Sequence, residues 1–267
     1  MNIRPIYAIM YRYFSILKGS PDRVLGLYIW MLIDMVLWGF ISTYLARILP
    51  PGFNAISAFL GAVLLVNFFS RVMLNINMTF FEDMWARNLL NLFASPLRIS
   101  EYLLGLIICG VITSTVGLVF SFCSAALLFG FSALAYGVAL VPFMFILFLF
   151  GIALGIFGCA VVLARGSSAE WFIWPIPAII SPFVGVYYPI NTLPEWMQTV
   201  STVLPPRYVF EGLRGVLAKQ PVDITQLSLG ISLAIGYIVL ASLIFLRVYR
   251  HSMRSGRIAR YSAENTN

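Results

Sequence analysis

Amide, hydroxyl and charged side chains recur at helical spacing inside one of the apolar runs of this chain. Asn67, Arg71 and Asn75 follow one another at every fourth position, and Ser70 and Glu82 fall near the same face of a helix. Polar groups at membrane depth are costly, so such a stripe must face other protein groups or a water-filled cavity. The stripe therefore predicts a buried polar contact or the lining of a pathway for a solute.

A further charged residue, Asp34, lies in the middle of the preceding apolar run. Asp34 and Arg71 each lie about ten residues from the expected cytoplasmic end of their run, which is a depth of ~15 Å at ~1.5 Å per residue. We therefore expect a buried ion pair between the two side chains. Replacing one partner alone should destabilise the protein, because the other charge would stay buried and unpaired. A structural role and a role in transport are both compatible with this position.

Residues that catalysis would need are missing from the sequence. The two lysines, Lys18 and Lys219, are not part of a G-x-x-x-x-G-K-[ST] motif, so the chain has no P-loop of its own for ATP. The single histidine, His251, lies in a basic tail, which excludes Ser–His intramembrane proteolysis and His-based metal sites. An aspartyl intramembrane protease needs two carboxylates in the membrane, and only Asp34 qualifies. We expect a chain that is not an enzyme and that binds no metal or cofactor itself.

Six apolar runs position these residues and fill most of the chain. A helix needs about 20 apolar residues to cross the hydrocarbon core, and each run is that long or nearly so. Hydrophobic residues make up 61% of the sequence and charged residues 10%, which predicts an all-α polytopic membrane protein with one transmembrane domain, residues 1–267. The expected spans are Val24–Leu45, Ala55–Asn77, Tyr102–Leu128, Val138–Leu163, Trp171–Tyr188 and Leu227–Leu246.

Basic residues are concentrated in every second connection between these runs. They concentrate before the first run, between the second and third, between the fourth and fifth, and after the sixth. The positive-inside rule then predicts six spans with both termini in the cytoplasm. The basic residues on the expected cytoplasmic side are Arg4, Arg12, Lys18, Arg23, Arg87, Arg98, Arg165, Arg247, Arg250, Arg254, Arg257 and Arg260.

Segments outside the runs are expected to lie at the membrane surface. Residues 1–23 contain an amphipathic interfacial helix, Ile3–Lys18, and residues 247–267 form a basic cytoplasmic tail. Residues 189–226 form the long external segment, in which Thr192 should open a capping box for the first of two short amphipathic helices. These helices are too short to span and should lie at the outer leaflet or dip back into it.

Glycines and prolines distinguish two of the runs. Gly151, Gly155 and Gly158 in the fourth run have the small-residue spacing that lets helices approach closely. Prolines in the fifth run free backbone carbonyls, which is tolerated only where neighbours or a cavity satisfy them, and they predict a broken helix beside a pathway. These prolines are Pro175, Pro177 and Pro182.

Two segments resemble signatures of the ABC-2 family, the membrane subunits of bacterial ABC exporters. The stretch from Phe81 to Arg98, FEDMWARNLLNLFASPLR, resembles the family's cytoplasmic segment after the second span, with its acidic start, short helix and Ser-Pro. The stretch from Ser181 to Arg214 contains SPFVGVYYP, LPEW, LPPRY and EGLR, and it resembles the family's short fifth span and the helices that follow. The pair Arg87-Asn88 departs from the pattern, because many relatives have Gly-Thr there.

This resemblance implies partners and a coupling element. In the family, the segment after the second span is a coupling helix that seats in a groove of a separate P-loop ATPase, which also holds ATP and Mg. A homodimer or close heterodimer of six-span subunits with two ATPases, in the bacterial cytoplasmic (inner) membrane, is implied as well. The coupling residues would be Glu82, Asp83, Met84, Trp85, Arg87, Leu89, Leu90 and Phe93.

The function implied by the resemblance is outward transport of a bulky amphipathic substrate. Closure of the ATPase pair would tilt the second and fifth spans, and a drug-like molecule, a lipid or a lipid-linked saccharide would each suit such a pathway. An ion-coupled carrier or channel, and a non-transporting assembly or sensor subunit, are the alternatives, and a bound P-loop ATPase with substrate-stimulated ATP hydrolysis separates the exporter from both. The candidate pathway residues are Asn67, Phe68, Asn75, Trp174 and Phe183.

Overall fold

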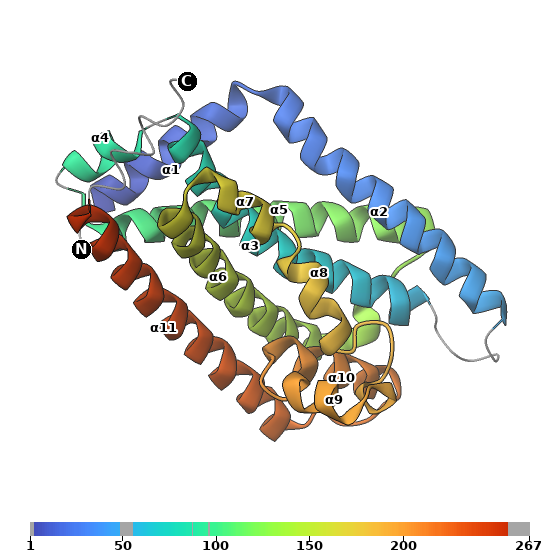
Figure 1. Ribbon diagram of the computed structural model, residues 1–267. Coiled ribbons are helices and arrows are strands. Elements are labelled where there is room, and N and C mark those ends of the chain that lie inside the picture. The colour runs from blue at the N-terminus through green and yellow to red at the C-terminus, as the bar shows by residue number, and fades with distance from the viewer. Residues whose placement is uncertain (1–2, 49–55, 87, 96, 256–267) are drawn as a thin grey trace.

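The computed structural model describes residues 3–48, 56–86, 88–95 and 97–255. Regular secondary structure in these ranges is helical throughout, and the long helices form one bundle (Figure 1). The α-helices are α1 (Ile3–Lys18), α2 (Pro21–Ile48), α3 (Gly61–Trp85), α4 (Leu89–Ala94), α5 (Ile99–Phe129), α6 (Leu140–Arg165), α7 (Glu170–Ile173), α8 (Ile176–Ile180), α9 (Glu195–Ser201), α10 (Pro205–Leu217) and α11 (Ile224–Arg254).

Five helical segments of the described ranges are long and apolar enough to cross a membrane. The first is the part of α2 from Tyr28 to Ile48, and the others contain α3, α5, α6 and α11, so the expected first, second, third, fourth and sixth runs each form a long helix. The expected fifth span, Trp171–Tyr188, is instead divided into α7, α8 and a 3-10 turn at Ser181–Phe183. The molecule is thus an all-helical, multi-pass membrane protein in which the fifth run is not a continuous helix.

Prolines explain the division of the fifth run. Pro175 separates α7 from α8, and because it has no N–H group it cannot continue the ladder of hydrogen bonds. Its carbonyl still accepts a bond from the Ile179 N–H at 2.9 Å. The carbonyl of Pro177 accepts from both the backbone N–H and the hydroxyl of Ser181, the hydroxyl at 2.9 Å. The broken helix expected from the prolines is confirmed.

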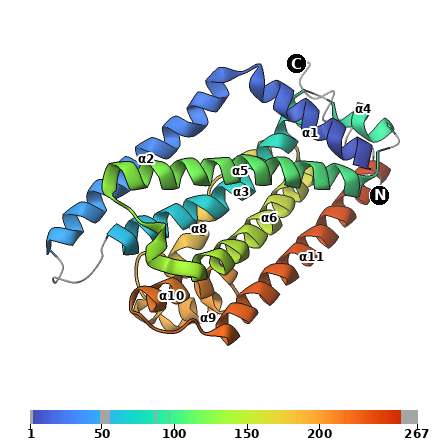
Figure 2. The ribbon, with the colours of Figure 1, turned by 180° about the vertical axis from the view of Figure 1, so that it is seen from behind.

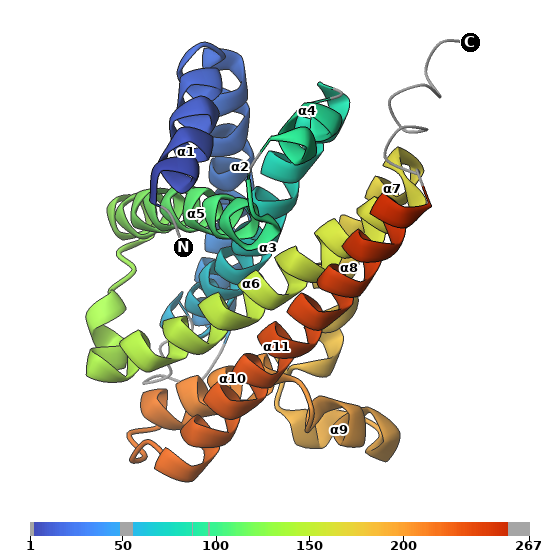
Figure 3. The same ribbon diagram turned by 90° about the vertical axis from the view of Figure 1, so that its left-hand side faces the viewer.

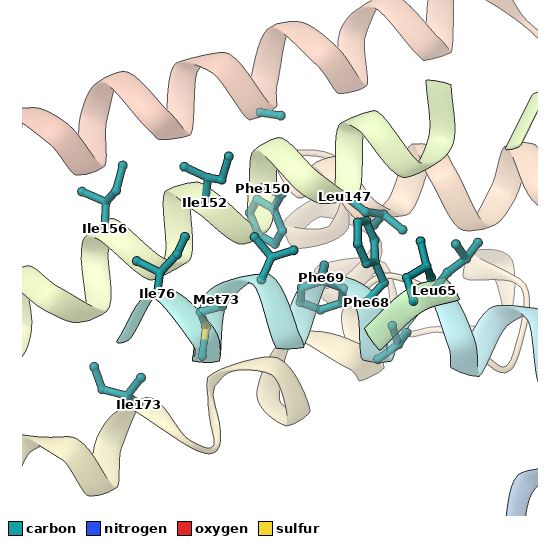
Figure 4. Packing of buried hydrophobic residues seen from close by; sticks show 14 of the residues in the cluster. Leu65, Phe68, Phe69, Met73, Ile76, Leu147, Phe150, Ile152, Ile156 and Ile173 are labelled. Carbon is teal, nitrogen blue, oxygen red and sulfur yellow. The ribbon is translucent and has the colours of Figure 1, made fainter. Parts of the chain in front are cut away.

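The core lies where α3 packs between α5 and α6, and α11 covers the outer side of α6 (Figures 3 and 4). Phe69, Met73 and Ile76 of α3 have no exposed surface, and Phe69 and Ile76 lie toward side chains of α6 such as Phe150 and Ile156 (Figure 4). A helix that is apolar on several faces must be covered by neighbours or lipid, and α3 is covered by neighbours. This packing fixes the orientation of the polar stripe on the remaining face of α3.

The close packing predicted from the glycines of α6 is confirmed. A Cβ atom on Gly155 would lie 2.9 Å from the Cβ atom of Ile76, and one on Gly158 would lie 2.3 Å from Oδ1 of Asn77. A Cβ atom on Gly151 would lie 2.8 Å from the carbonyl oxygen of Phe69. No ordinary side chain fits at these positions, so the small residues set the distance between α3 and α6.

Gly155→Ala is expected to lower the free energy of unfolding by about 1 kcal/mol, because the added methyl group overpacks the contact with Ile76. Gly236→Ala in α11 is the matched control. A Cβ atom there has no neighbour within 4 Å, so alanine should raise helix stability by about 0.5 kcal/mol. Thermal unfolding of both variants in nanodiscs checks the opposite signs, and equal shifts would contradict the packing described here.

The two ends of the bundle carry different short helices (Figure 2). One end, here called the α4 end, holds α1, α4 and the C-terminal end of α11, and the other, the α10 end, holds α9 and α10. The capping box expected at Thr192 is wrong. Its hydroxyl donates to the Pro189 carbonyl at 2.7 Å inside a 3-10 turn, and α9 begins only at Glu195, after Pro194 as N-cap residue. The two short helices expected in this segment are present as α9 and α10.

Candidate functional site

A cavity of about 590 Å³ lies between α2 and α3 in the half of the bundle nearer the α4 end. The two helices run apart there, and α1 and the junction of α7 with α8 border the space (Figure 1). Its volume is within the range of about 300–1,000 Å³ that is typical of sites for drug-sized molecules. The lining residues are Tyr13, Leu17, Gly26, Trp30, Asn67, Ser70, Arg71, Leu74, Asn75, Met78, Glu82, Trp85 and Trp174.

The polar stripe of α3 faces this cavity. Asn67, Ser70, Arg71 and Asn75 all line it, as their common helical face predicts. Asn75 is also anchored to α5, because its Nδ2 donates to the Ser114 hydroxyl at 2.9 Å. Spacing alone thus located the polar wall of the cavity, and the structure adds that the Asn75 amide of that wall is held by α5.

The ion pair expected between Asp34 and Arg71 is not formed. Oδ2 of Asp34 accepts a hydrogen bond from Nδ2 of Asn67, which lies one turn before Arg71 on the same stripe. Depth along the helices brought the two charges to similar heights, but it did not decide which side chain of the stripe reaches Asp34. The two charges attract each other without direct contact. Arg71 accordingly has no hydrogen bond or ion pair with any residue that the structure describes.

The other candidate pathway residues divide into two groups. Trp174 lines the cavity together with Asn67 and Asn75. Phe68 does not, because it is one position off the stripe and stacks on Phe148 of α6 with 6.4 Å between the ring centroids. Phe183 is also elsewhere, since its ring meets Trp196 of α9 edge to face at 6.0 Å. The expectation that Phe68 and Phe183 share one lining with the amides is therefore wrong.

Residues of α1 and α2 complete the cavity, and sequence reasoning did not single them out. Trp30 lies one turn before Asp34 on α2, and its side chain is 71% exposed. Tyr13 of α1 is buried, and burial raises the pKa of its phenol to about 12, so it stays a hydrogen-bond donor at neutral pH. The four-residue spacing of Trp30 and Asp34 places both on one face of α2, and this is the sequence signal that could have assigned Trp30 to the cavity.

The carboxylate of Asp83 lies inside the protein and not on a docking surface. Its side chain is 2% exposed, Oδ1 forms an ion pair with Nη2 of Arg12 on α1, and Oδ2 accepts the Tyr102 hydroxyl of α5 at 2.7 Å. One carboxylate therefore joins three helices. The expectation that Asp83 offers an exposed charged contact is corrected by this burial.

Trp85 ends α3 at the surface of the α4 end. Its side chain is 50% exposed, and its Nε1 donates to Oε1 of Glu170 at the start of α7 at 2.9 Å. Partial burial raises the pKa of Glu170, and the hydrogen bond from the indole acts in the opposite direction. This bond joins the end of α3 to the divided fifth run.

The segment expected to form one coupling helix is two helices with a turn between them. α3 continues to Trp85, and α4 follows as a separate short helix. In the turn, the Asn88 N–H donates to the carbonyl of Asp83 at 2.9 Å, which ends the helical ladder of α3. Because α3 itself reaches into this segment, movement of the turn would act directly on the wall of the cavity.

The remaining residues of this segment have different surroundings. Met84 and Leu89 are buried, with 9% and 3% of their surface exposed, so they pack against the bundle. Arg87 lies outside the described residues, and the side chains of Leu90 and Phe93 are outside them as well. A groove of about 290 Å³ between α1 and α4 adjoins the segment, and its lining includes Pro5, Ala8, Ile9, Arg12, Leu92, Ser95 and Leu97.

Comparison with known families gives one match over most of the chain. The family described as ABC-2 type transporter matches residues 6–218 of the 267 residues. The matched range contains every residue that lines the cavity and the whole segment from α3 to α4. No curated protein matches the chain.

Proposed function

Because the chain belongs to the ABC-2 type transporter family, we propose that it is the permease subunit of an exporter that moves a bulky amphipathic molecule outward. Membership in this family makes the chain a membrane-spanning transporter component and implies an ABC ATPase as its partner. The observation that carries the proposal is the cavity between α2 and α3. It offers amide and guanidinium groups beside three tryptophans, which is the mixture that an amphipathic molecule requires within a membrane.

The proposed pathway runs between two copies of the chain in a bacterial inner membrane. The cavity opens beside α2, whose remaining surface is apolar and little covered by its own chain. Ile33, Leu37 and Phe40 on that surface are each more than half exposed, at 53%, 57% and 66%. A second copy that packs against α2 would close the cavity on its open side, and its own cavity would complete the pathway.

Coupling to ATP hydrolysis is proposed at the α4 end, which we place in the cytoplasm. Trp85 offers an exposed aromatic surface there, and the groove between α1 and α4 lies on the same end. An ATPase held at both places would transmit its closure to α3 through the turn after Trp85, and to α7 through the bond with Glu170. The stripe of α3 and the broken fifth run would then move together.

The test is co-purification of the ATPase with Trp85→Ala. After purification from native membranes, we expect the amount of P-loop ATPase bound to this variant to be lower than that bound to the wild type by a factor of about five or more. A tryptophan that becomes buried in a complex is a frequent anchor of interfaces. ATP hydrolysis by the complex in nanodiscs should fall in proportion. Mass spectrometry of the purified complex identifies the ATPase from its peptides.

Glu170→Ala is the matched control. It removes the same hydrogen bond as Trp85→Ala but leaves the exposed indole in place. If docking uses the indole, Glu170→Ala keeps the ATPase and Trp85→Ala loses it. Equal retention by wild type and Trp85→Ala would exclude this docking surface, and a complete lack of ATPase in the wild-type preparation would favour a carrier or sensor.

A further inference from the structure

Arg71 is a permanent charge without a direct partner inside the membrane-spanning bundle. Its guanidinium carries five N–H donors and stays protonated, and no described residue accepts from it. Asp34 is the carboxylate that the sequence placed at the same depth as Arg71, and it accepts a hydrogen bond from Asn67 instead. An unpaired charge at this depth is costly. Arg71 lines the cavity, so a ligand bound there can accept hydrogen bonds from its guanidinium.

The charges of the cavity are separated along its length. Glu82 is the other charged lining residue, and it follows Arg71 by eleven positions, or ~16 Å along the helix axis at ~1.5 Å per residue. A small anion is therefore attracted to the Arg71 end of the cavity. The residual field of Asp34 weakens this attraction but does not fill the hydrogen-bonding capacity of the guanidinium.

The rest of the lining suits an apolar body. Trp30 and Trp174 are 71% and 49% exposed, and both line the cavity. Ring faces of this kind bind apolar chains and aromatic groups, while the planar guanidinium binds carboxylates and phosphates through paired hydrogen bonds. Together these side chains favour a ligand that has one acidic group attached to a hydrophobic body.

We propose that the cavity binds an amphipathic anion, with its carboxylate or phosphate at Arg71 and its apolar body against the tryptophans. The identification of this ligand as the exported substrate rests on the proposed function, whereas the binding site does not. Two sources supply such a ligand, a membrane lipid with a phosphate headgroup or a soluble amphipathic acid. The chemistry at Arg71 is the same for both.

The tryptophans allow binding to be measured directly. The full-length protein in phosphatidylcholine nanodiscs is titrated with an ω-bromo fatty acid, the matching ω-bromo alcohol and the matching ω-bromo trimethylammonium compound, and bromine quenches indole fluorescence on contact. We expect the acid to bind at least about tenfold more tightly than the alcohol, which corresponds to about 1.4 kcal/mol. Quenching that is equal for acid and alcohol, or strongest for the ammonium compound, would overturn the proposal.

Variants locate the selectivity at Arg71. Arg71→Gln should bind acid and alcohol alike, Arg71→Lys should keep part of the preference, and Arg250→Gln should keep all of it because that side chain is exposed on α11. A preference for the acid that survives in Arg71→Gln would refute the assignment. If Arg71→Gln does not fold, the comparison of the three probes on the wild type still decides whether the cavity selects anions.

Lipid composition separates the two sources. If the natural occupant is a lipid phosphate, replacing part of the phosphatidylcholine by phosphatidylglycerol should weaken binding of the bromo acid to the wild type but not to Arg71→Gln. Undiminished, Arg71-dependent binding would identify a soluble amphipathic acid. Loss of anion selectivity with an ATPase still bound would leave the exporter in place, and anion selectivity without an ATPase would leave the binding site in place.

Discussion

Asp83→Ala is expected to lower the free energy of unfolding by about 3 kcal/mol. The substitution removes the acceptor shared by Arg12 and Tyr102, and breaking a buried ion pair from one side costs about 3–5 kcal/mol because the other charge is left behind. The lower end applies here, since the Arg12 side chain is 32% exposed and water can replace part of the lost contact. α1 should detach from α3 and α5 before the bundle unfolds.

Denaturant titration in mixed micelles measures this loss, and limited proteolysis of α1 reports the detachment. Asp83→Asn is the control, because an amide oxygen still accepts from the Tyr102 hydroxyl and the helix contact keeps its shape. Its loss should be about half as large. If Asp83→Ala and Asp83→Asn unfold like the wild type, the carboxylate does not hold the three helices together.

Asn67→Leu is expected to cost about 2 kcal/mol. The half-buried carboxylate of Asp34 would lose the amide that donates to it, and hydrogen bonds to charged groups contribute about 1.5–3 kcal/mol. Asp34→Leu should cost a similar amount, because Asn67 then loses its acceptor and Arg71 loses its nearest opposite charge.

A double-mutant cycle isolates the contact between the two residues. Asp34→Leu combined with Asn67→Leu should cost about 1–2 kcal/mol less than the sum of the single losses, because residues in direct contact do not act additively. Ser70→Ala is the control on the same stripe, and it should change stability by less than about 0.5 kcal/mol since its hydroxyl bonds only within α3. Additive losses would show that Asp34 and Asn67 do not interact.

The architecture and one wall of the cavity follow from the sequence, because both depend on periodicity. A four-residue repeat fixes which residues share a helical face, and Asn67, Arg71 and Asn75 accordingly line one cavity. The glycines of α6 are equally informative, since small residues at that spacing are typical of close contacts between membrane helices. The prolines predicted the break between α7 and α8 for the same local reason.

Contacts between distant segments are not encoded in this way. The position along the two helices placed Asp34 and Arg71 at the same depth in the membrane. The rotation of α2 about its axis decides that Asn67, and not Arg71, binds Asp34. Asp83 has the composition of a surface charge, and only the position of α1 reveals that Arg12 buries it. Phe68 and Phe183 are aromatic like Trp174, yet a single residue's offset around a helix turns Phe68 toward α6.

The glycine-tight contact of α3 with α6 also divides the protein mechanically. Side chains added at Gly151, Gly155 and Gly158 would overlap α3, so the two helices are already at their closest approach. We therefore expect α3 and α6 to move together as one rigid pair. α2 is covered less by the rest of the chain, because 22% of its apolar stretch is buried, against 67% for the segment that contains α3, and its close contact at Gly39 is with the Phe129 side chain of α5. We therefore expect a load applied at the α4 end to change the separation of α2 from the α3–α6 pair, and the cavity of about 590 Å³ lies between α2 and α3.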